Sequence, residues 1–143
     1  MAEEPAYRVA LLSVHPEFAD ALLAGTKTVE FRKRPLAADV THVAIYATQP
    51  VGRVVGIFSI EEQVKGNPHQ LWRRFKHVAG ISRPKFFEYY EGHHEGVGIR
   101  VRELASFDEA FTLEDAFGIS RPPQSFQYFS SGQTHVALSG ALV

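Results

Sequence analysis

The chain has 143 residues, of which 45% are hydrophobic and 22% are charged, and its formal net charge at pH 7 is −1. These values are typical of a globular protein, so we expect a single domain over residues 1–143 and no disordered or collagen-like chain. The absence of cysteine excludes disulfide scaffolds, Cys-based zinc sites and thiol nucleophiles, and it fits a cytoplasmic location. The acidic start, Met1 to Pro5, is unlike a secretory signal, and no apolar stretch approaches the roughly 20 residues of a membrane helix.

The charges are unevenly distributed along the chain. Residues 27–85 hold eleven basic and four acidic side chains, a net charge of +7, whereas residues 1–26 carry −3 and residues 86–143 carry −5. If folding keeps these segments apart, the nearly neutral chain has a positive face that attracts anionic partners. If folding mixes them, the field cancels.

The N-terminal part predicts a strand, a helix and a second strand. The apolar run Tyr7–Val14 predicts a buried strand, because both of its faces are apolar. Pro16 suits the first turn of a helix, and Gly25 suits its left-handed end. Polar and apolar residues then alternate over Thr28–Arg34, which predicts a strand.

The central part predicts a hairpin followed by two helices. Strands are expected at Val40–Thr48 and Gly52–Ile60, joined by a turn at Gln49 and Pro50. Asn67 and Pro68 are a typical N-cap and first helical residue, and the helix that they begin is expected to reach about Ala79. Ser82 begins another helix, which is expected to end near Gly92.

The C-terminal part is mixed. We expect a strand at Val97–Leu104, a helical turn at Thr112–Phe117, a proline-fixed loop leading into aromatic residues at Arg121–Phe129, and a last strand at Thr134–Leu138. The order β-α-β-β-β-α-α-β with few helices predicts an α+β fold on a small, mostly antiparallel sheet or barrel. Alternating βαβ units are absent, which argues against a dinucleotide-binding Rossmann domain.

The polar face of the predicted strand Thr28–Arg34 carries the clearest functional signal. Its even-numbered side chains combine a hydroxyl, a carboxylate and two guanidinium groups: Thr28, Glu30, Arg32 and Arg34. This mixture suits recognition of a base edge together with a phosphate, and it lies in the segment with a net charge of +7. We therefore expect these side chains to line a concavity, although a solvated strand face with paired charges would have the same pattern.

Several motifs carry a resemblance to a known family. They are Ser13-Val14-His15-Pro16-Glu17-Phe18-Ala19, Leu23-Ala24-Gly25-Thr26-Lys27-Thr28-Val29-Glu30-Phe31-Arg32, Ile45-Tyr46-Ala47-Thr48, Val54-Val55-Gly56 and Arg121-Pro122-Pro123-Gln124-Ser125-Phe126. In these motifs the chain resembles the ASCH domain family, a branch of the PUA-like fold, and in particular its small bacterial members. The resemblance covers most of the chain.

The resemblance implies a PUA-like β-barrel of five or six strands flanked by helices. It implies a cleft near the first helix and second strand, with RNA or a modified nucleotide as the ligand. Some family members are amidohydrolases that act on acetylcytidine nucleosides, and others are described as ribonucleases. The amidohydrolases carry a lysine at the position of Lys27 but a threonine where this chain has Glu30, so only Lys27 is carried over.

A second wall of the cleft is expected at Arg121–Phe129. Paired prolines stiffen this loop, and Gln124 and Ser125 offer donors and acceptors for a base edge. Tyr128 is expected to stack on a base, and it shares a strand face with Phe126, while Phe129 lies on the other face. The aromatic residues would equally suit a core. By alternation alone, Tyr46 and Thr48 are also expected to line the cleft with Glu30.

Two other patterns are weaker. The helix that carries Trp72, Arg73, Arg74 and Lys76 is amphipathic and basic, which fits either a solvated outer face or a surface that follows phosphates. The seven histidines show no spacing typical of a shared metal site, so we expect no metal and no cofactor.

We therefore expect a domain that binds RNA or a nucleotide, with a modified base among the candidate ligands. Lys27, Arg32 and Arg34 would attract phosphate, and Glu30 would accept a hydrogen bond from an exocyclic amine. One alternative is a nucleoside amidohydrolase or metal-independent ribonuclease that uses Lys27 and Glu30 as general acid or base. Another is a protein-interaction or regulatory domain whose surface is the acidic C-terminal part.

Overall fold

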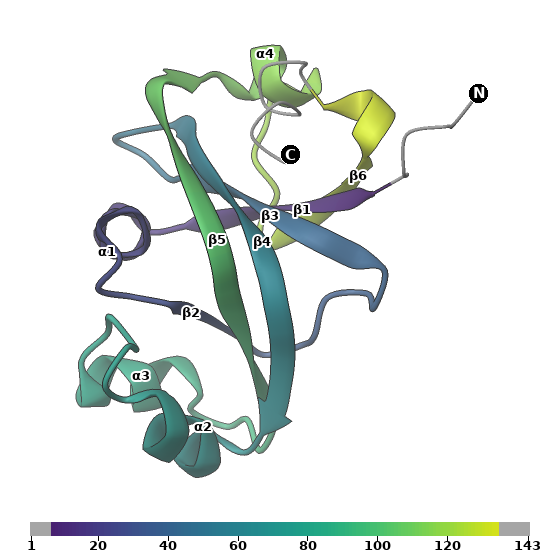
Figure 1. Ribbon diagram of the computed structural model, residues 1–143. Helices are drawn as coiled ribbons and strands as arrows, with labels where there is room; N and C mark the ends of the chain where they lie inside the picture. Colours follow the sequence, from purple (N-terminus) through teal and green to yellow (C-terminus); the bar gives the residue numbers. More distant parts are fainter. Residues whose placement is uncertain (1–6, 135–143) are drawn as a thin grey trace.

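The computed structural model describes residues 7–134 and arranges them as a six-stranded, mostly antiparallel sheet with helices packed at its ends and side (Figure 1). The strands are β1 (Arg8–Val14), β2 (Val29–Arg32), β3 (Val40–Ala47), β4 (Arg53–Gly66), β5 (Gly96–Phe111) and β6 (Phe126–Ser130). The helices are α1 (Pro16–Ala24), α2 (Pro68–Phe75), α3 (Arg83–Tyr89) and α4 (Leu113–Phe117), followed by a 3-10 turn at Ser131–Gln133. The expected α+β class and element order are confirmed.

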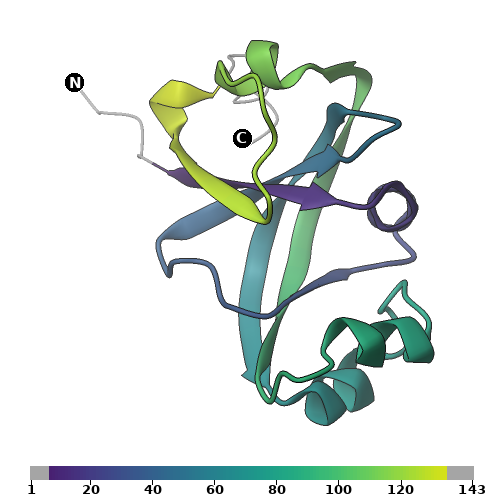
Figure 2. The ribbon, with the colours of Figure 1, turned by 180° about the vertical axis from the view of Figure 1, so that it is seen from behind.

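The strand order is β2-β5-β4-β3-β1-β6, so β2 and β6 are the two edges (Figures 1 and 2). Neighbouring strands pair antiparallel except β1 and β3, which are parallel. Within residues 7–134 no ladder joins β2 to β6, so the expected barrel is an open, curled sheet. The reason is local: β2 pairs only over Val29–Arg32, and the chain bends at Lys33 before a ladder with β6 can form.

Local sequence signals account for the helix boundaries. Gly25 ends α1 in the left-handed conformation, with φ 80°, as a residue without a Cβ does readily. Asn67 begins α2 with a reciprocal capping box, in which its side chain accepts from the Gln70 N–H and the Gln70 side chain accepts from the Asn67 N–H. Ser82 caps α3 in the predicted place. However, α2 ends at Phe75 and does not reach Ala79.

The antiparallel pair of β4 and β5, which α2 and α3 connect, extends beyond both predicted strands. Pairing continues from Ile60 to Gly66 on β4, and on β5 from Leu104 to Phe111. Much of the extension has exposed polar side chains, such as Glu62, which accepts from Arg100 at 2.5 Å. Alternation of apolar residues indicates that one face of a strand is buried, and it does not indicate that the strand is paired. The alternation is therefore weak at the ends of β4 and β5, where both faces are partly exposed to solvent.

Apolar side chains are packed on both faces of the sheet. Leu12, Ile45 and Phe58 belong to one cluster, which α1 covers, whereas Leu11 and Phe129 belong to a second, which α4 covers. Consecutive residues of β1 thus enter different clusters, which explains its continuous apolar sequence. As predicted, Phe129 lies apart from Phe126 and Tyr128, which pack on the first cluster.

A third cluster attaches α2 and α3 to β2 and covers a lysine. Phe75 and Phe86 pack on Phe31, and the turn after α2 lies on the stem of Lys27. Gly80 makes this approach possible, because a Cβ added there would overlap the Cβ of Lys27. Lys27 is consequently only 3% exposed.

The predicted last strand, 134–138, lies outside the described residues except for Thr134. Within the described part of the chain, no helix combines the length and apolar character that crossing a membrane requires.

A matched pair of glycine substitutions tests the close packing over Lys27. Gly80 and Gly118 both have positive φ, 60° and 71°, but only Gly80 has a neighbour within 4 Å of the added methyl group. Both Gly80→Ala and Gly118→Ala should lose about 1–2 kcal/mol through backbone strain. Gly80→Ala should lose about a further 1–3 kcal/mol through overpacking. Urea unfolding measures the difference, and equal losses would contradict the described packing.

Candidate functional site

A cleft of about 770 Å³ opens between the edge strand β2 and the loop that precedes β6. Lys27, Glu30 and Arg32 line one wall and the floor beneath it, and the opposite wall carries Gln124, Ser125 and Phe126. The two walls are nearly a hundred residues apart in sequence, and the open sheet brings them together. The cleft therefore occupies the region where the expected barrel fails to close.

Arg32 spans the cleft from one wall to the other. Its guanidinium donates to Glu30 Oε2 at 2.9 Å and to the carbonyl of Ser13, at the end of β1, at 2.8 Å. It also reaches Ser125 Oγ at 3.3 Å. A planar guanidinium with several fixed donors suits this bridging role, which a single ammonium does not match.

Ser13 fixes the second wall to β1. Its backbone N–H donates to the carbonyl of Ser125 at 3.2 Å, and its hydroxyl donates to the carbonyl of Pro123 at 2.7 Å. Because Arg32 also binds the Ser13 carbonyl, this one residue joins the proline loop, β1 and β2. The loop is thus held in place before any ligand arrives.

Lys27 lies at the floor of the cleft, almost completely buried. Its ammonium donates to the carbonyl of Ala79 at 2.6 Å and lies 4.0 Å from Glu30 Oε1. It also lies 5.1 Å from the centre of the Phe31 ring and 5.4 Å from that of Phe18. Burial lowers the pKa of Lys27 below its usual 10.5, an effect that the Glu30 carboxylate partly offsets.

The buried charges form a connected set. Glu30, 6% exposed, accepts from Arg32 on one oxygen and faces Lys27 with the other. One carboxylate between two cations leaves the floor of the cleft with a net positive charge while Lys27 is protonated. Such a floor favours an anion over a neutral ligand.

The rim adds exposed cations and aromatic rings. Lys33 and Arg34 follow β2 and are both exposed. The Lys33 ammonium lies 4.7 Å from the centre of the Tyr89 ring on α3, and burial raises the pKa of the Tyr89 hydroxyl. His93, which also borders the cleft, is exposed as well.

The structure brings together six of the ten side chains that the sequence analysis selected. They are Lys27, Glu30, Arg32, Arg34, Gln124 and Ser125. The predicted face of the strand is only partly correct, since Phe31 and Lys33 also border the cleft. Lys33 departs from the alternation because the strand ends at Arg32 and the chain bends beyond it, whereas Phe31 lies within the strand and borders the cleft from the third cluster.

The other four do not line the cleft. Tyr46 is 3% exposed and packs in the second cluster, near α4, and Thr48 lies just beyond β3. Alternation shows which residues share a face of the strand, but it does not show which layer of the fold that face packs against. Thr28 joins the turn after α2 by its backbone N–H, which donates to the carbonyl of Val78 at 3.1 Å. Tyr128 lies under the Arg8 guanidinium, and its hydroxyl accepts from the Ala37 N–H at 2.8 Å.

Sequence reasoning missed several cleft residues, above all Ser13, Phe18, Tyr89 and His93. Ser13 and Phe18 belong to the first quoted motif, so their place in it was a usable signal. Tyr89 and His93 had no such signal, because only tertiary packing brings α3 against β2. Across residues 7–134, no group of three or more His, Cys, Asp or Glu side chains has an arrangement suited to a metal ion.

Arg32→Lys tests the bridge while it retains the positive charge beside Glu30. A lysine cannot bind Glu30, Ser13 and Ser125 together, so the substitution should lower the free energy of unfolding by about 1–3 kcal/mol. Amide hydrogen exchange at Gln124 and Ser125 should accelerate. Arg34→Lys is the matched control, an exposed arginine of the same cleft, and should change neither quantity. Unchanged exchange in Arg32→Lys would show that the loop does not depend on the bridge.

Comparisons with known proteins agree with this architecture. The ASCH domain family matches residues 12–114. The chain is 33% identical over 145 residues to an "ASCH domain-containing ribonuclease" from Zymomonas mobilis, an alignment that covers 97% of this chain and 96% of that protein. The crystal structure of ASCH from Zymomonas mobilis superposes with a TM-score of 0.78 at 32% identity, covering 94% of this chain and 92% of that one. A serine-to-alanine mutant of that protein gives 0.77 at 33%, covering 85% and 87%. The chain therefore belongs to the ASCH domain family.

Proposed function

We propose that this chain binds single-stranded RNA in the cleft between β2 and the loop that precedes β6. The observation that carries the proposal is the set of Lys27, Glu30 and Arg32 at the floor of an open cleft, facing the amide and hydroxyl of Gln124 and Ser125. Cations supply attraction to phosphate, whereas amides and hydroxyls read base edges. The relative from Zymomonas mobilis, named as a ribonuclease, supports RNA as the ligand.

The rim suits a single strand better than a duplex. Exposed bases of a single strand stack on aromatic side chains, and Tyr89 and Phe126 border the cleft. Lys33 and Arg34 are the exposed cations beside them, outside the buried network that occupies Arg32. In this arrangement the rim cations bind phosphates, and the polar walls contact a base.

The salt dependence of binding tests the role of the rim cations. Fluorescence anisotropy with a 2′-O-methyl oligouridylate, which cannot be cleaved through its 2′ oxygen, should give an affinity that falls as salt rises. Replacement of Lys33 and Arg34 by alanine should reduce the slope of log affinity against log salt by roughly 0.7 for each phosphate that the variant no longer neutralises. Arg73 and Lys76, exposed cations of the α2 region outside the cleft, provide the control pair and should leave the slope unchanged.

A flat salt response of the unaltered protein would contradict the electrostatic part of the proposal. Equal slopes in the two double variants would place the RNA elsewhere on the surface.

A second candidate function is cleavage of the bound RNA by the chain's own side chains. The observation in its favour is Lys27, whose burial favours the neutral amine, 4.0 Å from a carboxylate that would stabilise the ammonium once formed. In this reaction the 2′ oxygen attacks the adjacent phosphorus, and the bond from phosphorus to the 5′ oxygen breaks. Lys27 takes the 2′ proton, and His15 or His93 on the cleft wall donates one to the departing oxygen.

Lys27→Met tests this candidate with little change in side-chain volume. Cleavage of a labelled RNA in EDTA should fall at least tenfold in Lys27→Met, because the general base is lost. The rate of the unaltered protein should follow a bell-shaped pH profile, because the reaction needs a deprotonated base and a protonated acid, and the limb that belongs to Lys27 should lie below 10.5, since burial lowers the pKa of Lys27. Lys76→Met is the exposed control and should retain full activity.

Retained cleavage in a folded Lys27→Met protein would exclude Lys27 as the base. Acetylcytidine is run in parallel, because the amidohydrolase alternative predicts loss of its acetyl group and the ribonuclease predicts none. Protein partners that persist after nuclease treatment would favour the interaction alternative.

A further inference from the structure

Two smaller hollows lie beside the cleft, and each shares a lining residue with the cleft and with the other hollow. The first, here the α2–α3 pocket, measures about 420 Å³ and is lined by residues that include His69, Phe87, His93 and His94. The second, here the Lys65 hollow, measures about 650 Å³ and includes Lys33, Lys65 and His94. His93 borders both the cleft and the α2–α3 pocket, and His94 borders both smaller hollows. Lys33 borders both the cleft and the Lys65 hollow, so these two are also neighbours.

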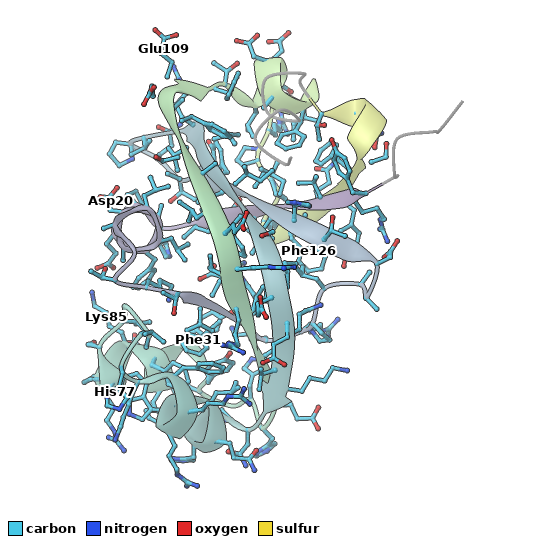
Figure 3. The ribbon with its side chains drawn as sticks, viewed as in Figure 1. Asp20, Phe31, His77, Lys85, Glu109 and Phe126 are labelled. Carbon is cyan, nitrogen blue, oxygen red and sulfur yellow. The ribbon has the colours of Figure 1, made fainter. Side chains whose placement is uncertain are left out.

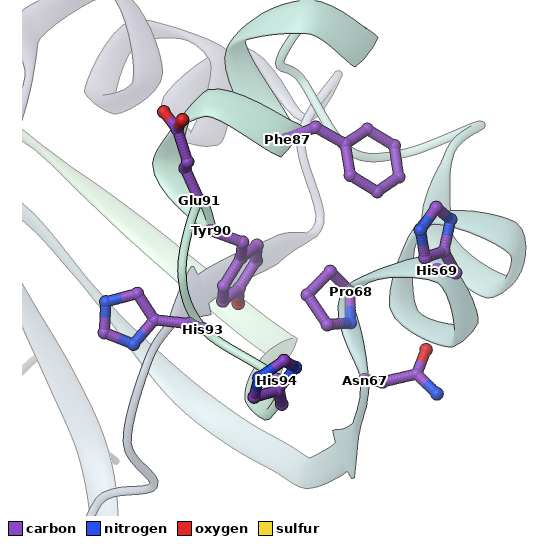
Figure 4. A pocket seen from close by; sticks show the side chains of 8 residues that line it. All are labelled: Asn67, Pro68, His69, Phe87, Tyr90, Glu91, His93 and His94. Carbon is purple, nitrogen blue, oxygen red and sulfur yellow. The ribbon is translucent and has the colours of Figure 1, made fainter.

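The α2–α3 pocket is lined by the exposed rings of three histidines and by the half-buried ring of Phe87. In Figure 4, His93 and His94 lie on one side of Tyr90 and Pro68, and His69 and Phe87 lie on the other. The His69 and Phe87 rings are 4.8 Å apart between centres, and the Arg83 guanidinium lies 4.9 Å from the centre of the Phe87 ring. Rings beside a guanidinium form a surface on which an unpaired base stacks.

The charges of the Lys65 hollow fit a polyanion, whereas the lining of the α2–α3 pocket has one glutamate and no lysine or arginine. Lys33 and Lys65 border the Lys65 hollow, although Glu95 borders it too, and Glu91 borders the α2–α3 pocket. The acidic side chains favour bases over phosphates beside them, so the phosphates are expected near the lysines. Figure 3 shows His77 and Lys85 at this end of the molecule and Glu109 at the far end, so part of the acidic C-terminal segment lies away from these hollows, although Glu91 and Glu95 of the same segment border them.

We propose that the cleft, the α2–α3 pocket and the Lys65 hollow form one continuous track for single-stranded RNA, so that the preferred ligand is an oligonucleotide and not a nucleotide. This inference rests on the proposed function of the cleft and extends it to the length of the ligand. The cleft binds the first bases, His69 and Phe87 stack on a later base, and Lys65 contacts a phosphate between them. A mononucleotide held in the cleft reaches none of these outer side chains.

The test compares a 2′-O-methyl dinucleotide with a 2′-O-methyl octanucleotide of the same base. The longer RNA should bind the unaltered protein roughly tenfold or more tightly, as one additional stacked base implies. His69→Ala and Lys65→Ala should each weaken the octanucleotide several-fold and leave the dinucleotide unchanged. Both residues are exposed, so the substitutions spare the core. His77→Ala and Lys76→Ala, exposed residues outside the three hollows, are the matched controls and should change neither affinity.

The outcomes separate this inference from the proposed function. If the dinucleotide binds and the longer RNA binds no more tightly, or if His69→Ala and Lys65→Ala behave like their controls, the track is wrong and the cleft stands. If neither RNA binds, both proposals fail. A glutamate octapeptide that displaces the octanucleotide from the track at equal concentration would also overturn the inference, because it would assign the surface to acidic peptides.

Discussion

The architecture of the site depends on one arginine side chain, Arg32, which spans the gap between the two edges of an open sheet. In the described part of the chain the edges β2 and β6 share no ladder, and Arg32 connects β2 with the end of β1 and with Ser125 just before β6. Removing Glu30 from this set would leave two cations at the floor of the cleft, and removing Arg32 would leave Glu30 with Lys27 at 4.0 Å. Buried ion pairs give little net stability compared with apolar side chains of similar size. Stability alone therefore does not explain three charged groups at this position, but Arg32 also joins the two walls of the cleft.

The sequence predicts the elements well wherever a cap or a buried face marks them. Pro16, Gly25, Asn67 and Ser82 lie at the predicted helix boundaries, because capping is a local interaction that a short stretch of sequence contains in full. The extended ends of β4 and β5 were missed since their side chains are solvated and show no apolar period. The barrel closure implied by the family resemblance was wrong in detail, because closure depends on how far β2 runs before it bends.

The residues of the candidate site also fall into those that local sequence identifies and those that only tertiary packing brings together. Lys27, Glu30 and Arg32 lie in one short motif, and the proline loop was selected for its residue types, so the two walls were identified separately. That the two walls face each other across one cleft depends on the tertiary structure and is not visible in the sequence. Tyr46 shows the limit of alternation: the pattern gives two faces of a strand but not which layer covers each, and here α4 and Phe129 cover the face of Tyr46. Tyr89 and His93 enter the site only because α3 packs against β2.

If RNA binds at the opening that Arg32 bridges, a titration of the ¹⁵N-labelled protein with a short 2′-O-methyl RNA will show it on both walls of the cleft. Backbone amide shifts should change together on both walls, over residues 29–34 and at Gln124 and Ser125, with a shared dissociation constant. Shifts confined to one wall, or to α4 and the acidic end of β5, would contradict binding at this opening.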